Sequence, residues 1–363
     1  MPQAKRLHSV QRQAASYNPK LPIAVLCRAS SWTDSILTSA NPPASNPLDL
    51  ISQDMVRVDQ VIAERLTTEV PLVREVAQYI IRAGGKRLRP AILLLVSGAL
   101  GSAHPHRHTL AAVVEFIHTA TLLHDDVVDE STLRRGRTTA NEKFGNAASV
   151  LVGDFLYSRA FQMMVDVNQM RVMQVLSDAT NVIAEGEVMQ LMNMHDASLD
   201  EAAYLRIIRS KTAKLFEASA RLAPILAGAD EATESLCADY GQALGTAFQV
   251  IDDVLDYEGN SEELGKNLGD DLREGKVTLP IICALKRASA EEQGLIRTSI
   301  EQGSLTHLPE ILSIIARTGA LDAARASAEA EAQRAVDAAS RLPNNPHSDA
   351  LLQLAAGLLD RRF

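Results

Sequence analysis

The chain has 363 residues, a formal net charge of −9 and a hydrophobic fraction of 46%. This composition is typical of a globular protein with a sizeable core, and the acidic balance argues against a nucleic-acid-binding protein. No stretch approaches the roughly 18 uninterrupted apolar residues of a membrane-spanning helix, so we expect no membrane anchor. The three cysteines, Cys27, Cys237 and Cys283, are too few and too scattered for a disulfide framework or a zinc site, which indicates a reducing compartment.

Residues 1–47 are predicted to form a disordered extension outside the fold. Residues 1–33 contain five Lys or Arg and no Asp or Glu, and residues 41–47 are rich in Pro and Asn. A basic, acid-free start is typical of an organelle transit peptide, but it also fits a disordered bacterial leader that begins at an upstream start codon. The first interpretation predicts a mitochondrial protein and the second a cytoplasmic one.

From residue 48 onward the pattern predicts one all-α domain, residues 48–363. Apolar residues recur at spacings of three and four, for example in residues 58–66 and 308–315, and alternating strand patterns are absent. The breaks rich in Gly, Pro and Asn are short, and no linker divides this part of the chain. We therefore expect a single large bundle of roughly ten or more helices.

A glycine-rich basic loop precedes one of these predicted helices. Residues 84–90 read Gly-Gly-Lys-Arg-Leu-Arg-Pro, and Pro90 fits the first turn of a helix. Helix N-termini and glycine backbone favour phosphate binding, and Lys86, Arg87 and Arg89 add positive charge. By itself this pattern is equally typical of a solvated basic loop.

An acidic motif occurs twice with the same spacing, as Asp-Asp-Val-Val-Asp at residues 125–129 and Asp-Asp-Val-Leu-Asp at residues 252–256. Because positions i and i+4 share a helix face, Asp125 projects with Asp129, and Asp252 with Asp256. Like charges at this spacing destabilise a helix unless a cation offsets them, and carboxylates without His or Cys suit Mg²⁺. One acidic pair is typical of a solvated face, but two matching motifs within apolar helices predict a metal site.

The same helical spacing extends each motif into a longer stripe. Positions i, i+4, i+7 and i+11 lie on one side of a helix. The first stripe comprises His118, Leu122, Asp125 and Asp129, and the second comprises Gly245, Gln249, Asp252 and Asp256. Further cations and polar groups follow along the chain, namely Arg134, Arg135, Arg137, Lys211 with Thr212, Lys266 and Lys276. No nucleotide-binding glycine motif is present, since Gly241 and Gly245 fall inside the second acidic helix. Metal-binding carboxylates combined with phosphate-binding cations imply a substrate that carries a diphosphate.

These motifs resemble those of the trans-isoprenyl diphosphate synthases. The shared segments are the basic loop, both acidic motifs and residues 115–124, Glu-Phe-Ile-His-Thr-Ala-Thr-Leu-Leu-His. Residues 141–154 and 183–190 further resemble the bacterial long-chain branch, in particular octaprenyl diphosphate synthases, which make the ubiquinone side chain. The resemblance covers roughly residues 50–363. It implies an isoprenoid-synthase helical bundle with a cavity between the two acidic helices, and it favours a bacterial cytoplasmic protein over a mitochondrial one.

The resemblance also implies a reaction and a set of residues for it. An allylic diphosphate, farnesyl diphosphate in the first round, would ionise and be attacked by successive isopentenyl diphosphates, with about three Mg²⁺ ions per active site. The implied metal ligands are Asp125, Asp129, Asp252 and Asp256. The implied catalytic residues are Asp125, Asp126, Asp129, Asp252, Asp253 and Lys211. Isopentenyl diphosphate would be bound by Lys86, Arg89, His118 and Arg135. The allylic diphosphate would be bound by Arg134, Lys211, Thr212, Gln249 and Lys266, with Lys276 as a further substrate-binding candidate.

Product length and assembly follow from the same resemblance. Short-chain members carry a bulky aromatic residue five positions before the first acidic motif, where this chain has Ala120 followed by Thr121. Small residues there would leave the path of the growing tail open. The family is typically homodimeric, and a long apolar product would be passed to membrane enzymes.

Four alternative functions share parts of this pattern. A terpene cyclase shares the first acidic motif, but the second motif, the basic loop and the low aromatic content, 14 residues, favour chain elongation. A non-catalytic subunit of a heteromeric synthase would have lost an acidic motif. A di-iron carboxylate bundle needs two Glu-x-x-His motifs, and only Glu115 and His118 form one. A shorter-chain synthase differs only in product length.

Overall fold

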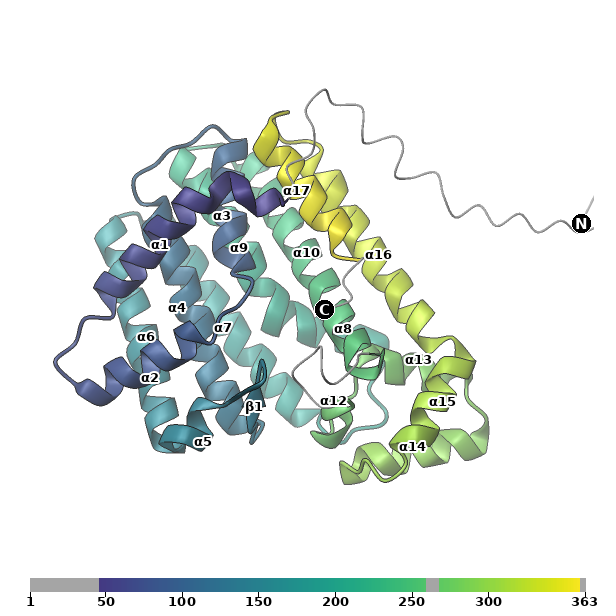
Figure 1. Cartoon of the computed structure of the whole chain (residues 1–363). Helices are drawn as coiled ribbons and strands as arrows, with labels where there is room; N and C mark the ends of the chain where they lie inside the picture. The colour runs from purple at the N-terminus through teal and green to yellow at the C-terminus, as the bar shows by residue number, and fades with distance from the viewer. Residues whose placement is uncertain (1–45, 259–267, 360–363) are drawn as a thin grey trace, which may run out of the picture. The chain divides into compact units, whose positions relative to one another are not determined.

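The computed structural model describes residues 46–258 and 268–359 (Figure 1). The predicted extension, residues 1–47, lies outside this part of the chain except for its last two residues, and so does Lys266. Among the described residues, no helix is both long enough and apolar enough to cross a bilayer.

The predicted all-α fold is confirmed, because helices make up nearly all of the regular structure. In the first half of the chain the helices are η1 (Pro47–Ile51), α1 (Ser52–Arg65), α2 (Pro71–Arg82), α3 (Leu88–Ala99), α4 (Arg107–Val128), α5 (Ala140–Phe144), α6 (Asn146–Val167) and α7 (Met170–Met192). In the second half they are α8 (Glu201–Ile208), η2 (Arg209–Ala213), α9 (Lys214–Ala227), α10 (Glu231–Glu258), α12 (Asp270–Arg273), α13 (Leu279–Arg287), α14 (Ala290–Gln302), α15 (Leu308–Thr318), α16 (Ala320–Ala339) and α17 (Pro346–Gly357).

A short antiparallel hairpin corrects the expectation that strands are absent. Strands β1 (Leu133–Arg134) and β2 (Arg137–Thr138) pair just after the first acidic motif. The two residues between them, Arg135 and Gly136, have φ values of 53° and 71°. Positive φ at both central positions is the geometry of the tight turns that match the twist of paired strands, and it places Arg135 at the tip.

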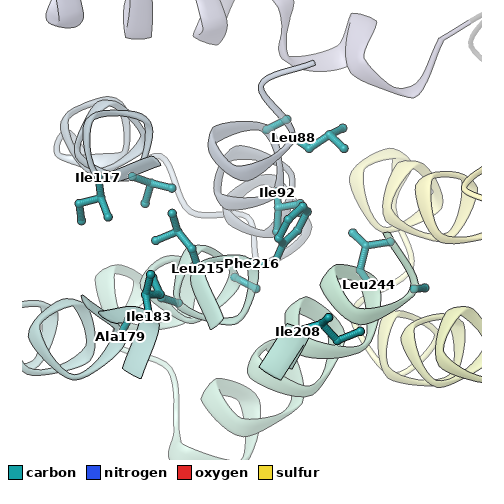
Figure 2. Close-up of a cluster of buried hydrophobic side chains, with 14 of the residues drawn as sticks. Leu88, Ile92, Ile117, Ala179, Ile183, Ile208, Leu215, Phe216 and Leu244 are labelled. Carbon is teal, nitrogen blue, oxygen red and sulfur yellow. The ribbon is translucent and has the colours of Figure 1, made fainter. Parts of the chain in front are cut away.

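Helix α3 lies at the centre of the hydrophobic core. Ten of its twelve residues are buried, because it packs against α4, α9 and α17. Figure 2 shows the layer that results, with Ile92 of α3 beside Phe216 of α9, and with Leu215 of α9 between Ile117 of α4 and Ile183 of α7. A helix that is apolar on all sides is expected only where neighbours cover all of it. Its N-terminus, and the basic loop before it, are thereby fixed against the core.

Helices α4 and α10 are long elements that each present one acidic motif. Helix α4 packs mainly against α6, and α10 packs mainly against α9 and α16. The chain between α8 and α9 forms a single π-helical turn, η2, in which Lys211 and Thr212 lie. Turns of this kind are rare and frequently occur at functional sites.

Candidate active site

A cavity of about 690 Å³ opens beside the C-terminal ends of α4 and α10. The loop before α3, the hairpin, α7, α8, η2, α9 and the segment around α12 complete its wall. It is lined by most of the residues predicted from the sequence, which are Lys86, Arg89, His118, Thr121, Asp125, Asp129, Arg134, Arg135, Lys211, Thr212, Gln249, Asp252, Asp253, Asp256 and Lys276. One cavity therefore gathers carboxylates and cations from segments far apart in the sequence.

Some of the residues singled out from the sequence are not in the cavity wall, and Arg137 of the hairpin is one of them. Ala120 is fully buried in the core, although its neighbour Thr121 lines the cavity. Asp126 is also fully buried, since it points away from the stripe of His118 and Asp125. Gly245 packs against η2 and α9, where an added Cβ would lie 2.7 Å from the Cα of Ala213.

Asp126 has a clear structural partner in the hairpin. Its Oδ1 accepts a hydrogen bond from Nε of Arg134 at 2.8 Å and forms an ion pair with Nη2 at 2.7 Å. Burial opposes the charge of Arg134, but the hydrogen bond and charge of Asp126 raise the pKa of the guanidinium. Asp126 thus holds Arg134 at the cavity, while its predicted catalytic role stays a prediction.

Both acidic motifs lie at helix C-termini, where the helix dipole disfavours negative charge. Burial, together with the repulsion of Asp129, raises the pKa of Asp125, although Lys211 and Arg134 partly offset the effect. In the second motif, Asp252 and Asp256 line the cavity, and Asp256 Oδ2 accepts a hydrogen bond from the backbone of Asp271. A cation bound between these carboxylates would stabilise their negative charge.

Asp253 is the most deeply enclosed carboxylate of the second motif. It accepts hydrogen bonds from the hydroxyl of Tyr204 at 2.5 Å and from Nε2 of Gln249 at 2.8 Å. Burial and the nearby Asp271 raise its pKa well above the ordinary value. Gln249 in turn accepts a hydrogen bond from Oγ1 of Thr212 at 2.9 Å, so a polar chain links α8, α10 and η2.

The carboxylates fit Mg²⁺ held together with a substrate. Among the described residues, no three His, Cys, Asp or Glu side chains converge closely enough to hold a metal by themselves. Mg²⁺ usually keeps several waters and binds through one or two carboxylates plus substrate phosphates. Paired carboxylates on two helices around one cavity match that pattern. The di-iron alternative needs a second Glu-x-x-His ligand set, and the described residues provide none.

Glycine allows the basic loop and the hairpin to meet at the cavity. Gly85 has a φ of 153°, and a Cβ at this position would lie 2.7 Å from Nη1 of Arg135. The guanidinium at the hairpin tip therefore rests directly on the backbone of the loop that carries Lys86. Burial and the neighbouring Arg134 lower the pKa of Arg135, a sign that positive charge is concentrated here.

Arg89 and His118 form the innermost part of this basic wall. Nη1 of Arg89 lies 3.2 Å from Nε2 of His118, and because Arg only donates, that nitrogen accepts the hydrogen bond. Burial, with the charge of Arg89, lowers the pKa of His118 well below its ordinary value, so the ring is neutral. Among the described residues, Nε of Arg89 and Oε2 of Glu115 have no hydrogen-bond partner. Buried groups of this kind are suited to bind a polar ligand.

Glu187 is a site residue that the sequence reasoning did not assign. Its carboxylate pairs with Nζ of Lys211 at 2.7 Å, and burial together with Asp125 raises its pKa to about 7. The preceding Gly186 lets α7 approach η2, since a Cβ there would lie 2.6 Å from the backbone nitrogen of Lys211. On the other side, Arg209 of η2 pairs with Glu331 of α16 at 2.7 Å. The turn η2, which carries Lys211, is therefore tied to both α7 and α16.

Comparison with known proteins finds that this chain is similar to polyprenyl diphosphate synthases in both sequence and structure. Residues 70–315 match the polyprenyl synthetase family. The chain is 52% identical over 308 residues to the octaprenyl diphosphate synthase of Escherichia coli, covering 85% of this chain and 95% of that protein. It is 46% identical to an all-trans-nonaprenyl-diphosphate synthase of Rhodobacter capsulatus, covering 86% and 96%. It is also similar to a crystal structure of polyprenyl synthase from Caulobacter crescentus complexed with calcium and isoprenyl diphosphate, with a TM-score of 0.84, 44% identity, and coverage of 89% and 100%.

Proposed function

The chain belongs to the polyprenyl synthetase family, and we propose that it extends an allylic diphosphate by successive isopentenyl units to octaprenyl diphosphate. The observation that carries this proposal is the joint lining of one cavity by two carboxylate pairs and a separate basic wall. Such a cavity can hold two diphosphates at once. Octaprenyl is the product named for the Escherichia coli relative, whereas the nonaprenyl relative is less similar.

We assign the two diphosphates to the two sides of the cavity. The basic loop and the first stripe supply Lys86, Arg89, His118 and Arg135 for isopentenyl diphosphate. The hairpin, η2 and α10 supply Arg134, Lys211, Thr212 and Gln249 for the allylic diphosphate. The predicted contribution of Lys266 lies outside the described residues.

Metal binding is proposed at the carboxylates that face the allylic side. Asp125 and Asp129 on α4, with Asp252 and Asp256 on α10, would hold about three Mg²⁺ ions through carboxylate and diphosphate oxygens. When bound, these ions stabilise negative charge on the departing diphosphate. Lys276, whose ammonium group contacts Asp129, closes this side of the cavity.

The protein's own groups bind, orient and exclude water during the reaction. Lys211 and Arg134 stabilise the oxygens of the leaving diphosphate as the allylic C–O bond breaks and the diphosphate keeps the electron pair. The double bond of isopentenyl diphosphate then attacks the allylic cation and forms the new C–C bond. A proton leaves the adjacent carbon for the departing diphosphate, so no protein base is required. Apolar wall residues such as Ile208 and Phe248 keep water from the cation.

The growing tail is proposed to run along α4 away from the acidic motif. Thr121 faces the cavity one turn before Asp125, and neither it nor Ala120 is bulky. Further along α4 the neighbouring side chains are aliphatic, as Figure 2 shows for Ile117 beside Leu215 and Ile183. An apolar path of this kind suits a polyprenyl chain.

A homodimer is proposed through the outer face of α6 and α7. Large apolar side chains there are strongly exposed, with relative exposures of 66% for Leu151, 63% for Val165, 80% for Met170 and 78% for Met192. These side chains lie near both ends of the two helices, and exposed apolar surface is typical of protein interfaces. Transfer of the product to membrane enzymes of ubiquinone synthesis, and a bacterial cytoplasmic location, stay predictions.

The test is incubation with farnesyl diphosphate, isopentenyl diphosphate and Mg²⁺, followed by sizing of the dephosphorylated products in the presence of detergent. A product ladder that ends at octaprenyl supports the proposal. Products that stop at C15 or C20 identify a short-chain synthase, and cyclic hydrocarbons identify a terpene cyclase. Chelation of divalent cations should abolish all turnover, and added Mg²⁺ should restore it.

A further inference from the structure

In the part of the chain that the structure describes, the partly buried guanidinium of Arg89 forms no ion pair with a carboxylate. Its contacts in the described structure are the hydrogen bond to His118 and the face of the Phe216 ring, whose centroid lies 4.3 Å from Cζ. Glu115 contributes only through its charge, and burial lowers the pKa of Arg89 to about 10. The Phe216 ring is therefore the main surface against which this cation rests.

Phe216 is itself fixed by two glycines of α10. A Cβ at Gly241 would lie 2.4 Å from the carbonyl oxygen of Phe216, and one at Gly245 would lie 2.9 Å from its Cβ. Glycine inside a helix costs about 1 kcal/mol relative to alanine, so two glycines one turn apart indicate a packing requirement. They form a notch that allows α9 to sit unusually close to α10.

The notch brings the backbone and Cβ of Phe216 close to α10. The side chain is fully buried, and Figure 2 shows it directed from α9 toward α3, beside Ile92. Arg89 lies on the same helix, one turn before Ile92. A second ring, that of Phe248, lies 5.4 Å from the Phe216 ring and lines the cavity next to Gln249.

We propose that Phe216 is a positioning residue for isopentenyl diphosphate, which acts by holding the guanidinium of Arg89 against its ring. A cation–π contact is strongest where both groups are shielded from water. Because Cζ of Arg89 lies over the ring, the N–H groups of the guanidinium that point away from the ring stay available for diphosphate oxygens. This inference rests on the proposed role of Arg89 in binding isopentenyl diphosphate.

The first experiment compares Phe216→Leu with Phe116→Leu by steady-state kinetics and thermal unfolding. Phe116 is a matched control, because it is equally buried but lies on α4 outside the cavity wall. Phe216→Leu should raise the KM for isopentenyl diphosphate about tenfold, with kcat and the KM for the allylic substrate changed less than about twofold. Phe116→Leu should lower the melting temperature similarly and leave both KM values unchanged. Equal KM effects from the two variants would overturn the proposal.

The second experiment keeps the shape of the ring and changes only its electrostatics. A trifluorinated phenylalanine incorporated at position 216 weakens the negative ring face, and it should raise the same KM several-fold without loss of stability. An unchanged KM would show that the ring acts through packing alone and would overturn the proposal.

A double-mutant cycle separates this inference from the proposed function. If Arg89→Gln leaves the KM for isopentenyl diphosphate unchanged, the assignment of the isopentenyl site fails. If Arg89→Gln raises that KM, Phe216→Leu should add little in the Arg89→Gln background, because the contact is already lost. Full additivity of the two effects would overturn the role of Phe216 while leaving the proposed function intact.

Discussion

The ammonium group of Lys276 lies 2.8 Å from Oδ2 of Asp129, although 147 residues separate them in the sequence. The same ammonium lies 2.7 Å from Glu274, and all three side chains are largely buried. Burial opposes the charge of Lys276, but the two carboxylates raise its pKa above the ordinary value. The end of α4 is thereby tied to the segment that follows α12.

Loss of this cation should be costly to stability. We expect Lys276→Met to lower the free energy of unfolding by about 2–4 kcal/mol, because Asp129 loses a buried ion pair and Glu274 keeps only its contact with Arg273. The control is Lys286→Met, which breaks an exposed pair with Glu201 and should cost about 0.5 kcal/mol or less. Urea denaturation at neutral pH measures both values. Similar losses for the two variants would contradict the structural role of Lys276.

The proposed metal ligands should separate activity from stability. Asp125→Ala and Asp252→Ala should each reduce turnover by about a thousandfold or more, because a ligand for Mg²⁺ is lost. Their melting temperatures should stay the same or rise, since Asp125→Ala also removes repulsion with Asp129. Asp239→Ala, on the exposed face of α10, is the control and should keep full activity. Near-normal turnover of either ligand variant at saturating Mg²⁺ would refute the assignment.

Gly186 provides a test of how closely α7 must approach η2. Gly186→Ala forces a Cβ to within 3.0 Å of both the backbone nitrogen and the Cα of Lys211, so we expect a loss of about 1–3 kcal/mol in stability. The KM for the allylic substrate should also rise, because Lys211 moves. Gly294→Ala, inside α14 with open space around it, should instead stabilise by about 0.5–1 kcal/mol. Both effects are readable from chemical denaturation, and stabilisation by Gly186→Ala would contradict the geometry.

The neutral state of His118 predicts a defined pH dependence. Its pKa lies well below the ordinary value of 6.5, mainly because of burial and then of Arg89, so the unfolded chain binds the proton more readily. The native state therefore loses stability as pH falls below about 6.5, and this contribution is fully present above that value. His118→Gln keeps an acceptor for Arg89 and does not titrate. We expect the unfolding free energy of His118→Gln to fall less steeply than that of the wild type between pH 7.5 and 5. Equal slopes of unfolding free energy against pH for the two proteins would contradict the neutral, buried state of His118.

Product length should respond to bulk beside the first acidic motif. We expect Ala120→Tyr to shift the products from the octaprenyl range to roughly C15–C20, because one helical turn of about 5.4 Å is comparable to one isoprene unit. Thr121→Tyr is the companion variant, since Thr121 faces the cavity directly whereas Ala120 is enclosed by the core. Chromatography of the dephosphorylated products gives the answer. If only Thr121→Tyr shortens the product, Ala120 is small because of helix packing.

Helical periodicity explains which parts of the site were predictable. His118, Asp125 and Asp129 face one cavity because their spacing places them on one side of α4, and Asp252 and Asp256 do so on α10. The same geometry of about 100° per residue turns Asp126 away from that face, so its inward position was also accessible from the sequence.

Other site residues depend on packing between helices that no local pattern reveals. Glu187 and Tyr204 lie on α7 and α8 and become recognisable only when Lys211 and Asp253 are seen beside them. The hairpin escaped prediction because its strands have only two residues each, and because Arg135 is an unusual choice for a position with positive φ.

The π turn at η2 determines how α9 is rotated about its axis relative to α8. A regular α-helix advances about 100° per residue, so one additional residue in a turn rotates the downstream helix by that amount relative to the upstream one. Deleting a single residue from residues 209–213 would restore a continuous α-helix between α8 and α9. Either the polar face of η2 or the apolar face of α9 would then swing away from its partners. This part of the chain therefore tolerates substitution far better than it tolerates a change in length.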